Sequence, residues 1–364
     1  MEKYKHPEDI CAHLGDDYDR YLGAIVPPIF QNSLFTRKRE SFGYSYSRIN
    51  NPTIEILEKK LAALEHAQAA RVFSSGMAAI TATLTSLLKA GDHAVVLRCA
   101  YYPVCRFFLD ELEKFGIQVD FVEHGTPEEF EAAIRPNTTL FYLESPSSNI
   151  FRIQDLRAIA AVAKRHEIVT VIDNTWATPL YQNPLDLGID YVVHSATKYL
   201  GGHSDIIMGA VMGSQAHMDQ IRNGERAFWG SIPDPFSAWL LTRSLRTLEI
   251  RMRRHSENAN AVAHFLEKDS RVKKVYYPGL TSHEGHETAL SQMRGFRDVY
   301  KRQLRGIVPA ARGLRPRRSE DYFPYHLRDT LLIIRPRCAQ LISICFCSGS
   351  LQHAEARLFD ERCV

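Results

Sequence analysis

The stretch that decides the fold is YVVHSATKYLGGHSD, residues 191–205. It begins with a short apolar run typical of a buried strand, and hydroxyl residues, one lysine and two glycines follow at once. Reactive side chains of parallel α/β sheets gather where the strands end, and Lys198 lies at such a position. A lysine that is desolvated near other cations is suited to Schiff-base formation, whereas most lysines are solvated surface residues.

The sequence around this stretch alternates between strand and helix patterns from about residue 53 to residue 250. This alternation predicts an α/β fold with a mostly parallel central sheet and helices on both faces. We expect strands over 93–97, 117–122, 139–144, 168–173 and 191–195, and helices over 53–67, 76–90 and 156–168. A long helical connection over 235–269 would lead into a second domain, with its first strand over 272–278.

The composition is that of a globular protein large enough for two domains, with 364 residues, 45% hydrophobic and 24% charged. The sequence contains no apolar run long enough to cross a membrane and no signal peptide, so we expect a cytoplasmic protein without membrane partners. The cysteines lack metal-ligand spacing, and His194 and His203 have no other ligands beside them. We therefore expect no metal site, and we expect both histidines either to be structural or to support the side chains that form the site.

Three further features follow predicted strands. Ser75 and Gly76 begin a predicted helix, whose free amides and dipole favour a phosphate group. Asp173 ends an apolar strand, where a carboxylate needs a cationic partner such as a protonated pyridine nitrogen. Tyr101 or Tyr102 follows another strand and could stack on a flat cofactor.

Each of these features has an ordinary explanation when it is taken alone. The serine could simply cap its helix, the aspartate could cap the next one, and a tyrosine is common in loops. It is the joint occurrence of all of them with Lys198 that favours a cofactor site.

Eight motifs spread over roughly residues 20–297 carry a family resemblance. They are VPPIFQNSLF, YSYSRINNPT, SSGMAAI, ESPSSN, IDNTWA, HSATKYLGGHS, TRSLRTLEIRMRRH and YYPGL. This set resembles the Cys/Met-metabolism (transsulfuration) enzymes, which depend on pyridoxal 5'-phosphate (PLP). The resemblance implies fold type I, which is aspartate-aminotransferase-like, and homodimers that pair into homotetramers. Residues 1–52 would form an arm that reaches the neighbouring subunit's site, 53–250 the PLP-binding large domain, and 251–297 the start of the C-terminal domain.

The resemblance also implies roles for individual residues. Lys198 would form the Schiff base with PLP and act as the base, Asp173 would pair with the pyridine nitrogen, and Tyr101 would stack on the ring. The phosphate group would be held by residues of two loops and, from the neighbouring subunit, of the arm: Ser75, Gly76, Met77, Ser195, Thr197, Tyr46 and Arg48. The substrate would be a small amino acid, and no nucleic acid is expected as a partner.

The resemblance implies a carbon–sulfur lyase, and the motifs favour β-elimination of cystathionine or a related S-substituted cysteine. AYYP, ESPSS and the tryptophan after DNT are similar to the family's β-lyases, whereas YSRINNPT and YQNPLDLG look more like its γ-acting branch. Three alternatives stay open at this stage. They are γ-elimination or replacement, as in cystathionine γ-synthase, γ-lyase or O-acetylhomoserine sulfhydrylase; an aminotransferase of the same fold; and a protein that binds PLP without turnover.

The resemblance ends near residue 297, and the C-terminal domain is predicted to be truncated or replaced. Residues 298–303, DVYKRQ, match the translation of a sequencing-adapter end. From residue 301 onward, eleven Arg and one Lys stand against six acidic residues, so the basic net charge of +3 arises there and not from a nucleic-acid site. The family's arginine motif for the substrate carboxylate is absent from 298–364, and we assign that role to neither Arg335 nor Arg337.

Overall fold

A seven-stranded sheet lies at the centre of the computed structural model, which describes residues 4, 6–36, 43–270, 272 and 274–296. The strands, in their order across the sheet, are β1 (Ala69–Phe73), β7 (Gly209–Gly213), β6 (Tyr191–His194), β5 (Val169–Asp173), β4 (Thr138–Glu144), β2 (His93–Leu97) and β3 (Gln118–Val122). Neighbours from β6 to β3 pair in parallel, and β7 lies antiparallel between β6 and β1. The mostly parallel sheet is therefore confirmed, while the predicted tail 298–364 lies outside the described residues.

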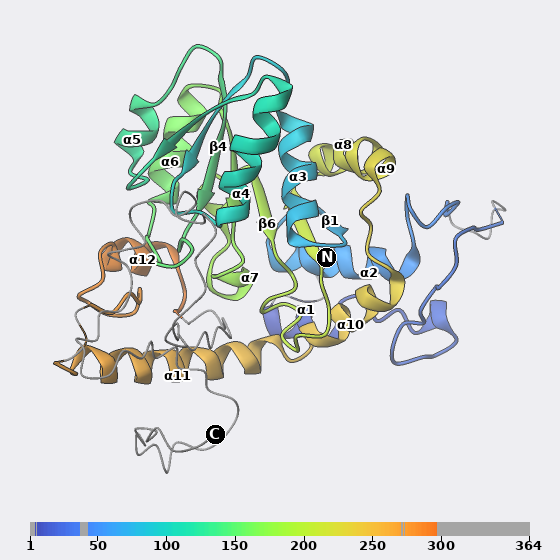
Figure 1. The fold of residues 1–364 in the computed structure, drawn as a ribbon. Helices are drawn as coiled ribbons and strands as arrows, with labels where there is room; N and C mark the ends of the chain where they lie inside the picture. Colours follow the sequence, from blue (N-terminus) through green and yellow to red (C-terminus); the bar gives the residue numbers. More distant parts are fainter. Residues whose placement is uncertain (1–3, 5, 37–42, 271, 273, 297–364) are drawn as a thin grey trace, which may run out of the picture. The chain divides into compact units, whose positions relative to one another are not determined.

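The helices of the described residues connect and cover these strands (Figure 1). They are α1 (Pro7–His13), α2 (Pro52–Leu64), α3 (Gly76–Leu87), α4 (Tyr102–Arg106), α5 (Pro127–Ala132), α6 (Leu156–Arg165), α7 (Thr178–Tyr181), α8 (Gln215–Asn223), α9 (Glu225–Trp229), α10 (Pro235–Leu245), α11 (Leu248–Glu267) and α12 (His286–Gln292). Short 3₁₀ or π turns lie at Asp19–Tyr21, Phe107–Glu111, Leu112–Phe115 and Pro184–Leu187.

The predicted element bounds agree closely with the structure. All five expected strands are present within one residue at each end, and the three expected helices each stop three residues early. Two of those helices stop because His66 and Glu167 take left-handed backbone conformations just beyond them. Strands β1 and β7 were not predicted, because AARVF contains a charged residue and GAVMG contains two glycines, so neither is an uninterrupted apolar run.

Alternation along the strands sends side chains to two buried faces of the sheet. One face carries Val96, Tyr142 and Val193, which share a core cluster with residues of α3, α4 and α8. The other face carries Phe141, whose ring lies 4.8 Å from that of Phe130 on α5, and is covered also by α2 and α6. The result is the three-layer arrangement expected for an α/β protein.

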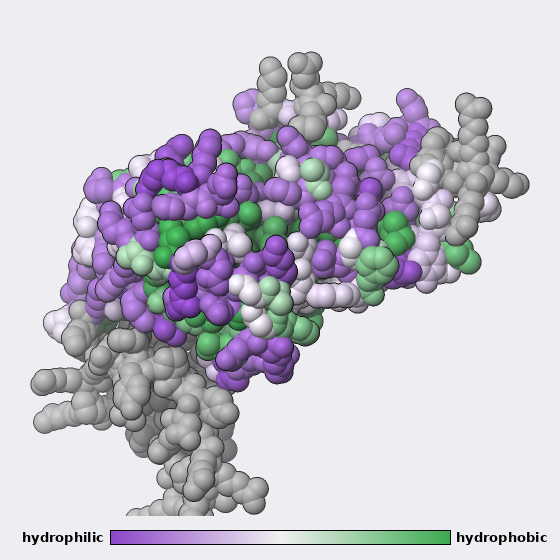
Figure 2. All heavy atoms as spheres, turned by 90° about the horizontal axis from the view of Figure 1, so that it is seen from above, coloured by the Kyte–Doolittle hydropathy of each residue, from purple (hydrophilic) through white to green (hydrophobic). Residues whose placement is uncertain are grey.

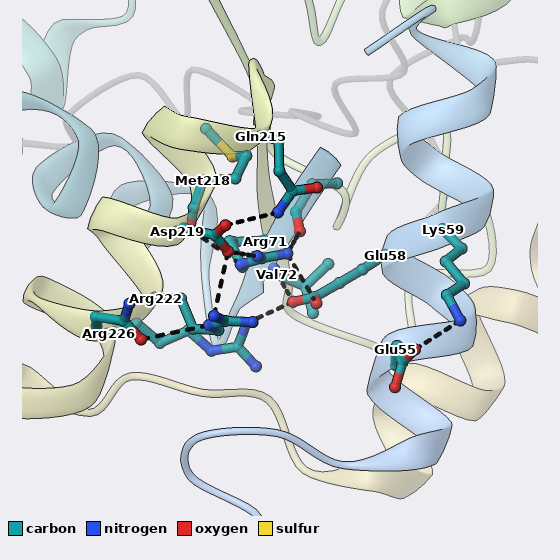
Figure 3. Close-up of polar contacts among 12 residues, drawn as sticks. Glu55, Glu58, Lys59, Arg71, Val72, Gln215, Met218, Asp219, Arg222 and Arg226 are labelled. Atoms are coloured by element: carbon teal, nitrogen blue, oxygen red, sulfur yellow. Dashed lines mark hydrogen bonds and ion pairs between the residues drawn. The ribbon is translucent and has the colours of Figure 1, made fainter. Parts of the chain in front are cut away.

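The outer edge of β1 is covered by α2, and a buried ion cluster joins the two (Figure 3). Glu58 accepts a hydrogen bond from the backbone N–H of Val72 at 3.0 Å, so the open edge of the strand is satisfied by a side chain. The same carboxylate pairs with Arg226 and, at 3.5 Å, with Arg71. Arg71 also reaches Asp219 on α8 at 2.9 Å. The cluster therefore ties α2, β1, α8 and α9 together.

The C-terminal part of the described chain differs from the prediction. The expected helix over 235–269 is two helices, which break at Arg246 and Thr247. The expected strand over 272–278 is wrong, because residues 272 and 274–278 pair with no strand of the described chain and a strand requires such a partner. Tyr277 and Leu280 instead form a small core cluster with Ala263 of α11.

The surface and the cysteines add little to this picture. Figure 2 shows one face of the molecule, on which hydrophilic residues predominate. None of the described helices is long and apolar enough to cross a membrane. Cys11, Cys99 and Cys105 are free thiols, and the part of the chain that the structure describes contains no group of three or more His, Cys, Asp or Glu side chains that could hold a metal.

Candidate functional site

The sheet topology brings the predicted site residues to one edge. Strands β2, β4, β5 and β6 run in the same direction, and β1 runs the same way because both it and β6 lie antiparallel to β7. The segments that follow these strands therefore meet at a single edge. They carry Ser75, Tyr101, Asp173 and Lys198, which the sequence nominated separately.

The N-terminus of α3 is held close to the end of β6. Ser75 caps the helix by accepting the Ala78 N–H at 3.0 Å, and the amides of Gly76 and Met77 have no acceptor within the helix. A Cβ atom built on Gly76 would lie 2.9 Å from the Cβ and Oγ atoms of Ser195. Glycine is therefore required at this position, and the Ser195 hydroxyl lies beside the free amides of the helix.

Asp173 is a buried carboxylate at the end of β5, with 6% of its surface exposed. Its Oδ1 accepts the Thr175 N–H at 2.9 Å, and no ion pair to it is found among the described residues. Burial raises the pKa of Asp173 above its ordinary value, although the Thr175 hydrogen bonds and the nearby His194 and Lys198 oppose this rise. Asp173 is therefore placed to receive a cationic partner.

Lys198 lies in a tight turn directly after β6. Its N–H donates to Ser195 O at 3.0 Å, and its carbonyl accepts the Gly202 N–H at 2.7 Å. The side chain is exposed in this chain, so the expectation of a desolvated lysine is wrong for the single protomer. The reason is that the rest of the described chain leaves the Lys198 side chain uncovered at the turn after β6.

Arg251 of α11 donates hydrogen bonds to the backbone of the same turn. Its guanidinium donates to Tyr199 O at 2.6 Å and to Ser244 O at 3.0 Å. Gly202 has a φ of +75°, and a Cβ atom there would lie 2.1 Å from Arg251 Nη1. Both the backbone angle and the contact therefore require glycine at this position.

Tyr101 is held by a residue that sequence reasoning missed. Its N–H donates to Glu144 Oε2 at 2.6 Å, and Ser148 Oγ donates to Glu144 Oε1 at 2.6 Å. Glu144 ends β4 in register with Asp173 on β5. Glu144 thus holds the backbone of the exposed Tyr101 from the strand next to the one that carries the buried carboxylate. The parallel register, which the sequence alone does not reveal, was the signal needed to find Glu144.

Thr197, which is predicted to hold the phosphate group, contacts the backbone of Met208, and its predicted role stays a prediction. Its hydroxyl donates to Met208 O at 3.2 Å and accepts the Met208 N–H at 3.0 Å, and its own N–H also donates to Met208 O. Both of its donors are engaged with the segment before β7. In this structure Thr197 ties two loops together, and Ser195 offers the hydroxyl at the helix terminus.

Tyr46 and Arg48 lie on the N-terminal arm. The Arg48 guanidinium stands over the Tyr46 ring at 5.2 Å and donates to the carbonyl of Ala227 on α9. No described hydrogen bond or ion pair joins either side chain to Lys198 or Asp173 of the same chain. The structure thus brings these two residues together, and their predicted role from the neighbouring subunit stays a prediction.

The two histidines make protein contacts, as the sequence predicted for structural residues. His194 is buried and pairs with the buried Glu65 carboxylate at 2.5 Å. His203 contacts Gly201 O at 2.8 Å through Nδ1.

A sheet edge that joins a lysine, a buried aspartate, a tyrosine and a free helix N-terminus is typical of a PLP-binding enzyme. A model of the family described as Cys/Met metabolism PLP-dependent enzyme matches residues 8–308. The chain therefore belongs to that family, its cofactor is PLP, and its fold is fold type I.

Relatives with several different names match this chain to a similar degree. It is 42% identical over 306 residues to a probable cystathionine gamma-synthase of Herpetosiphon aurantiacus, covering 84% of this chain and 96% of that protein. It is 42% identical over 308 residues to a cystathionine beta-lyase of Coxiella burnetii, covering 83% and 79%. An L-methionine gamma-lyase of Pseudomonas putida is 39% identical over 313 residues, covering 83% and 79%. The solved structure of MetB from Corynebacterium glutamicum matches with a TM-score of 0.78 and 39% identity, covering 80% and 77%.

The residues at the edge of the sheet fit PLP on physical grounds. The buried Asp173 lacks a cationic partner among the described residues, and a protonated ring nitrogen would supply one. The free amides of Gly76 and Met77, with the Ser195 hydroxyl beside them, suit a phosphate group. Lys198 offers an accessible amine on the adjoining turn.

Proposed function

We propose that the chain is a PLP-dependent carbon–sulfur lyase that converts cystathionine or a related S-substituted cysteine to a thiol, pyruvate and ammonia. The observation that carries this proposal is the position of Lys198, one turn beyond the strand next to the buried and unpaired Asp173. That pairing suits chemistry in which a substrate amine is bound covalently and a proton leaves its Cα.

The chain's own residues would divide the work as follows. Ser75, Gly76, Met77 and Ser195 would hold the cofactor phosphate, and Asp173 would keep the ring nitrogen protonated. Bound PLP supplies an electron sink for the negative charge that develops at Cα.

Two further groups would act on the substrate side. The Lys198 amine would anchor the cofactor and then take the proton from Cα of the substrate. Tyr101, held by Glu144, would stack on the cofactor ring and fix its plane.

Elimination at Cγ is the second candidate. The relatives named gamma-synthase and gamma-lyase are as similar to this chain as the one named beta-lyase, so identity does not favour either reaction. The motifs AYYP and ESPSS and the buried Trp176 support the β assignment.

We further propose that the active form is a homodimer or homotetramer with a shared site. Among the described residues, no hydrogen bond or ion pair joins Tyr46 or Arg48 to Lys198 of their own chain. The arm and the helices α9 and α10 expose large apolar side chains that a second copy would cover. They include Leu22, Ile25 and Val26 of the arm, Phe228 and Trp229 of α9, and Phe236 of α10.

The products of L-cystathionine distinguish these reactions. The purified full-length chain, loaded with PLP, should release pyruvate, ammonia and homocysteine, which are the products of β-elimination. Formation of 2-oxobutanoate and cysteine would instead favour the γ-reaction. A chain that binds PLP and releases neither keto acid would be a cofactor-binding protein without this activity.

A further inference from the structure

The two strand ends that carry the site are joined on the opposite face of the sheet by a buried carboxylate. Asp173 pairs in register with Val193, so their side chains point to one face. The next residues, Asn174 and His194, therefore point to the other. Glu65, which caps the C-terminal end of α2, meets them there.

The contacts of Glu65 are short and numerous. Its Oε1 accepts hydrogen bonds from His194 Nε2 at 2.5 Å and from Asn174 Nδ2 at 2.8 Å. Its Oε2 accepts one from Asn183 Nδ2 at 3.3 Å. Asn174 is held in turn by Gln182, whose Nε2 donates to Asn174 Oδ1 at 3.0 Å and to Ser145 O at 2.8 Å. The network therefore connects the ends of β4, β5 and β6 with α2.

All members of this network are buried, and Glu65 has no exposed surface. Among the described residues no Lys or Arg pairs with Glu65, so its negative charge is compensated by His194 and two amides alone. A buried carboxylate costs several kcal/mol to desolvate, and an apolar replacement of a buried ion pair is often more stable. A role in stability alone therefore explains the network poorly. Its contacts with the chain neighbours of Asp173 and Ser195 suggest a role in the arrangement of the site.

We infer that Glu65 is a positioning residue of the PLP site, which acts through Asn174 and His194. Asn174 directly follows Asp173 in the chain, and His194 directly precedes Ser195. By holding both from one carboxylate, Glu65 fixes the distance between the group that binds the ring nitrogen and the loop that carries Ser195 and Lys198. This inference rests on the proposed cofactor role of those residues.

Glu65→Gln tests the inference, because it keeps the side-chain shape but removes the charge and one acceptor. We expect the purified full-length variant to bind PLP at least about tenfold more weakly in a fluorescence titration. The pH at which the absorbance of bound PLP changes should also move, since Asp173 and Lys198 are no longer held at their original separation. The unfolding midpoint of the cofactor-free protein should also fall, because a buried charged pair loses one partner. PLP affinity and its pH titration are therefore compared at a temperature at which both proteins are folded.

Asp190→Asn is a control at an exposed carboxylate that joins the same two strands. Asp190 accepts hydrogen bonds from the N–H and hydroxyl of Thr170, both at 2.8 Å, and so joins the same two strands at their opposite ends. This variant should bind PLP within about twofold of the wild-type chain. Asn174→Ala removes a single donor to Glu65 and serves as a second variant if Glu65→Gln does not fold.

The possible results distinguish a failure of the proposed function from a failure of the role given to Glu65. If the wild-type chain fails to bind PLP, the proposed function itself is wrong. If it binds PLP and Glu65→Gln has the wild-type affinity and pH titration, only the positioning role is overturned. The role is also overturned if neither Glu65→Gln nor Asn174→Ala folds, because the network would then serve stability.

Discussion

Single residues of the Lys198 turn are constrained by both backbone angle and contact. Gly202 and Gly91 both have a positive φ, but only Gly202 has a neighbour that an added Cβ would displace, the Arg251 guanidinium. We expect Gly91→Ala to cost about 1–2 kcal/mol from its backbone angle alone. Gly202→Ala should cost about 1–3 kcal/mol more from the displaced neighbour, and should also weaken PLP binding. Urea unfolding of the two variants checks this, and equal losses would contradict it.

Asp173 is expected to lower the stability of the cofactor-free protein. Its pKa is raised by burial, so the folded state binds a proton more tightly than the unfolded state does. Stability from this group is full below its ordinary pKa and falls as the pH rises through the folded value. Asp173→Asn should therefore unfold at a higher temperature than wild type at pH 8, while PLP binding is weakened. The temperature gain should shrink toward pH 4, and a gain that is independent of pH would contradict this explanation.

The site residues could be predicted from the sequence by their residue types and by their positions at or after the ends of strands. Lys198, Asp173, Ser75 and Tyr101 lie at one edge because six of the seven strands, all but β7, run in one direction. Glu144 and Glu65 could not be predicted in the same way. Their roles depend on the register of β4 with β5 and on where α2 ends, and neither follows from local sequence. The exposure of Lys198 also depends on what surrounds the turn, rather than on the turn's sequence.

Among the helices and strands, the ion cluster between α2 and the outer edge of β1 gives a prediction about stability. Glu58 compensates Arg226 and Arg71 in a buried cluster and satisfies the Val72 N–H of β1. Removing its charge leaves two buried arginines with less compensation, and Glu58→Gln should cost about 3–5 kcal/mol of unfolding free energy.

The neighbouring pair on the same helix provides the control (Figure 3). Lys59 pairs with Glu55 at 2.6 Å on the exposed side of α2. Lys59→Gln should cost less than about 1 kcal/mol, because exposed ion pairs contribute little. Chemical denaturation of both variants measures the difference, and a loss of similar size in the two would contradict the role given to the buried cluster.

The missed elements have a physical explanation. The five predicted strands are apolar runs in a parallel sheet that is buried on both faces, and such runs are recognised by composition. β1 contains Arg71, which is acceptable only because Asp219 and Glu58 lie nearby in space. β7 is rich in glycine because its backbone passes close to Ser75, where a Cβ on Gly209 would lie 2.1 Å from the Ser75 carbonyl oxygen. Both features arise from tertiary contacts.

The stability of the whole molecule should depend on pH through one buried lysine. Lys60 of α2 donates to Cys11 O at 2.9 Å, and burial lowers its pKa to about 8. Below pH 8 both states carry the proton, and the folded state bears the full cost of the buried charge. As the pH rises from about 8 to the ordinary lysine pKa of about 10.5, the folded state loses the proton first and this cost disappears.

Lys60→Met isolates this effect. The difference in unfolding free energy between the variant and the wild type should be most favourable to the variant below pH 8. It should decline by up to about 3 kcal/mol between pH 8 and pH 10.5. Denaturant titrations at several pH values measure the change, and a constant difference across that range would show that Lys60 is not a titrating buried charge.

A shared site makes a prediction at the level of the assembly. Lys198→Ala and Arg48→Ala should each have little activity alone, because every site lacks one of the two residues. If both are co-expressed with different tags, half of the dimers are mixed and each mixed dimer has one complete site. Product formation should then recover to about a quarter of the wild-type rate. Absence of any recovery in purified mixed dimers would contradict a shared site.

The central claim is that Lys198 binds PLP covalently at the edge of the sheet beside Asp173. The most direct measurement is the visible absorbance spectrum of the purified full-length chain after incubation with PLP and removal of the excess. We expect a yellow Schiff-base band in the wild-type chain that borohydride reduction fixes to Lys198 and that Lys198→Ala lacks. A wild-type chain without the band, or a Lys198→Ala variant that retains it after the same treatment, would contradict the account.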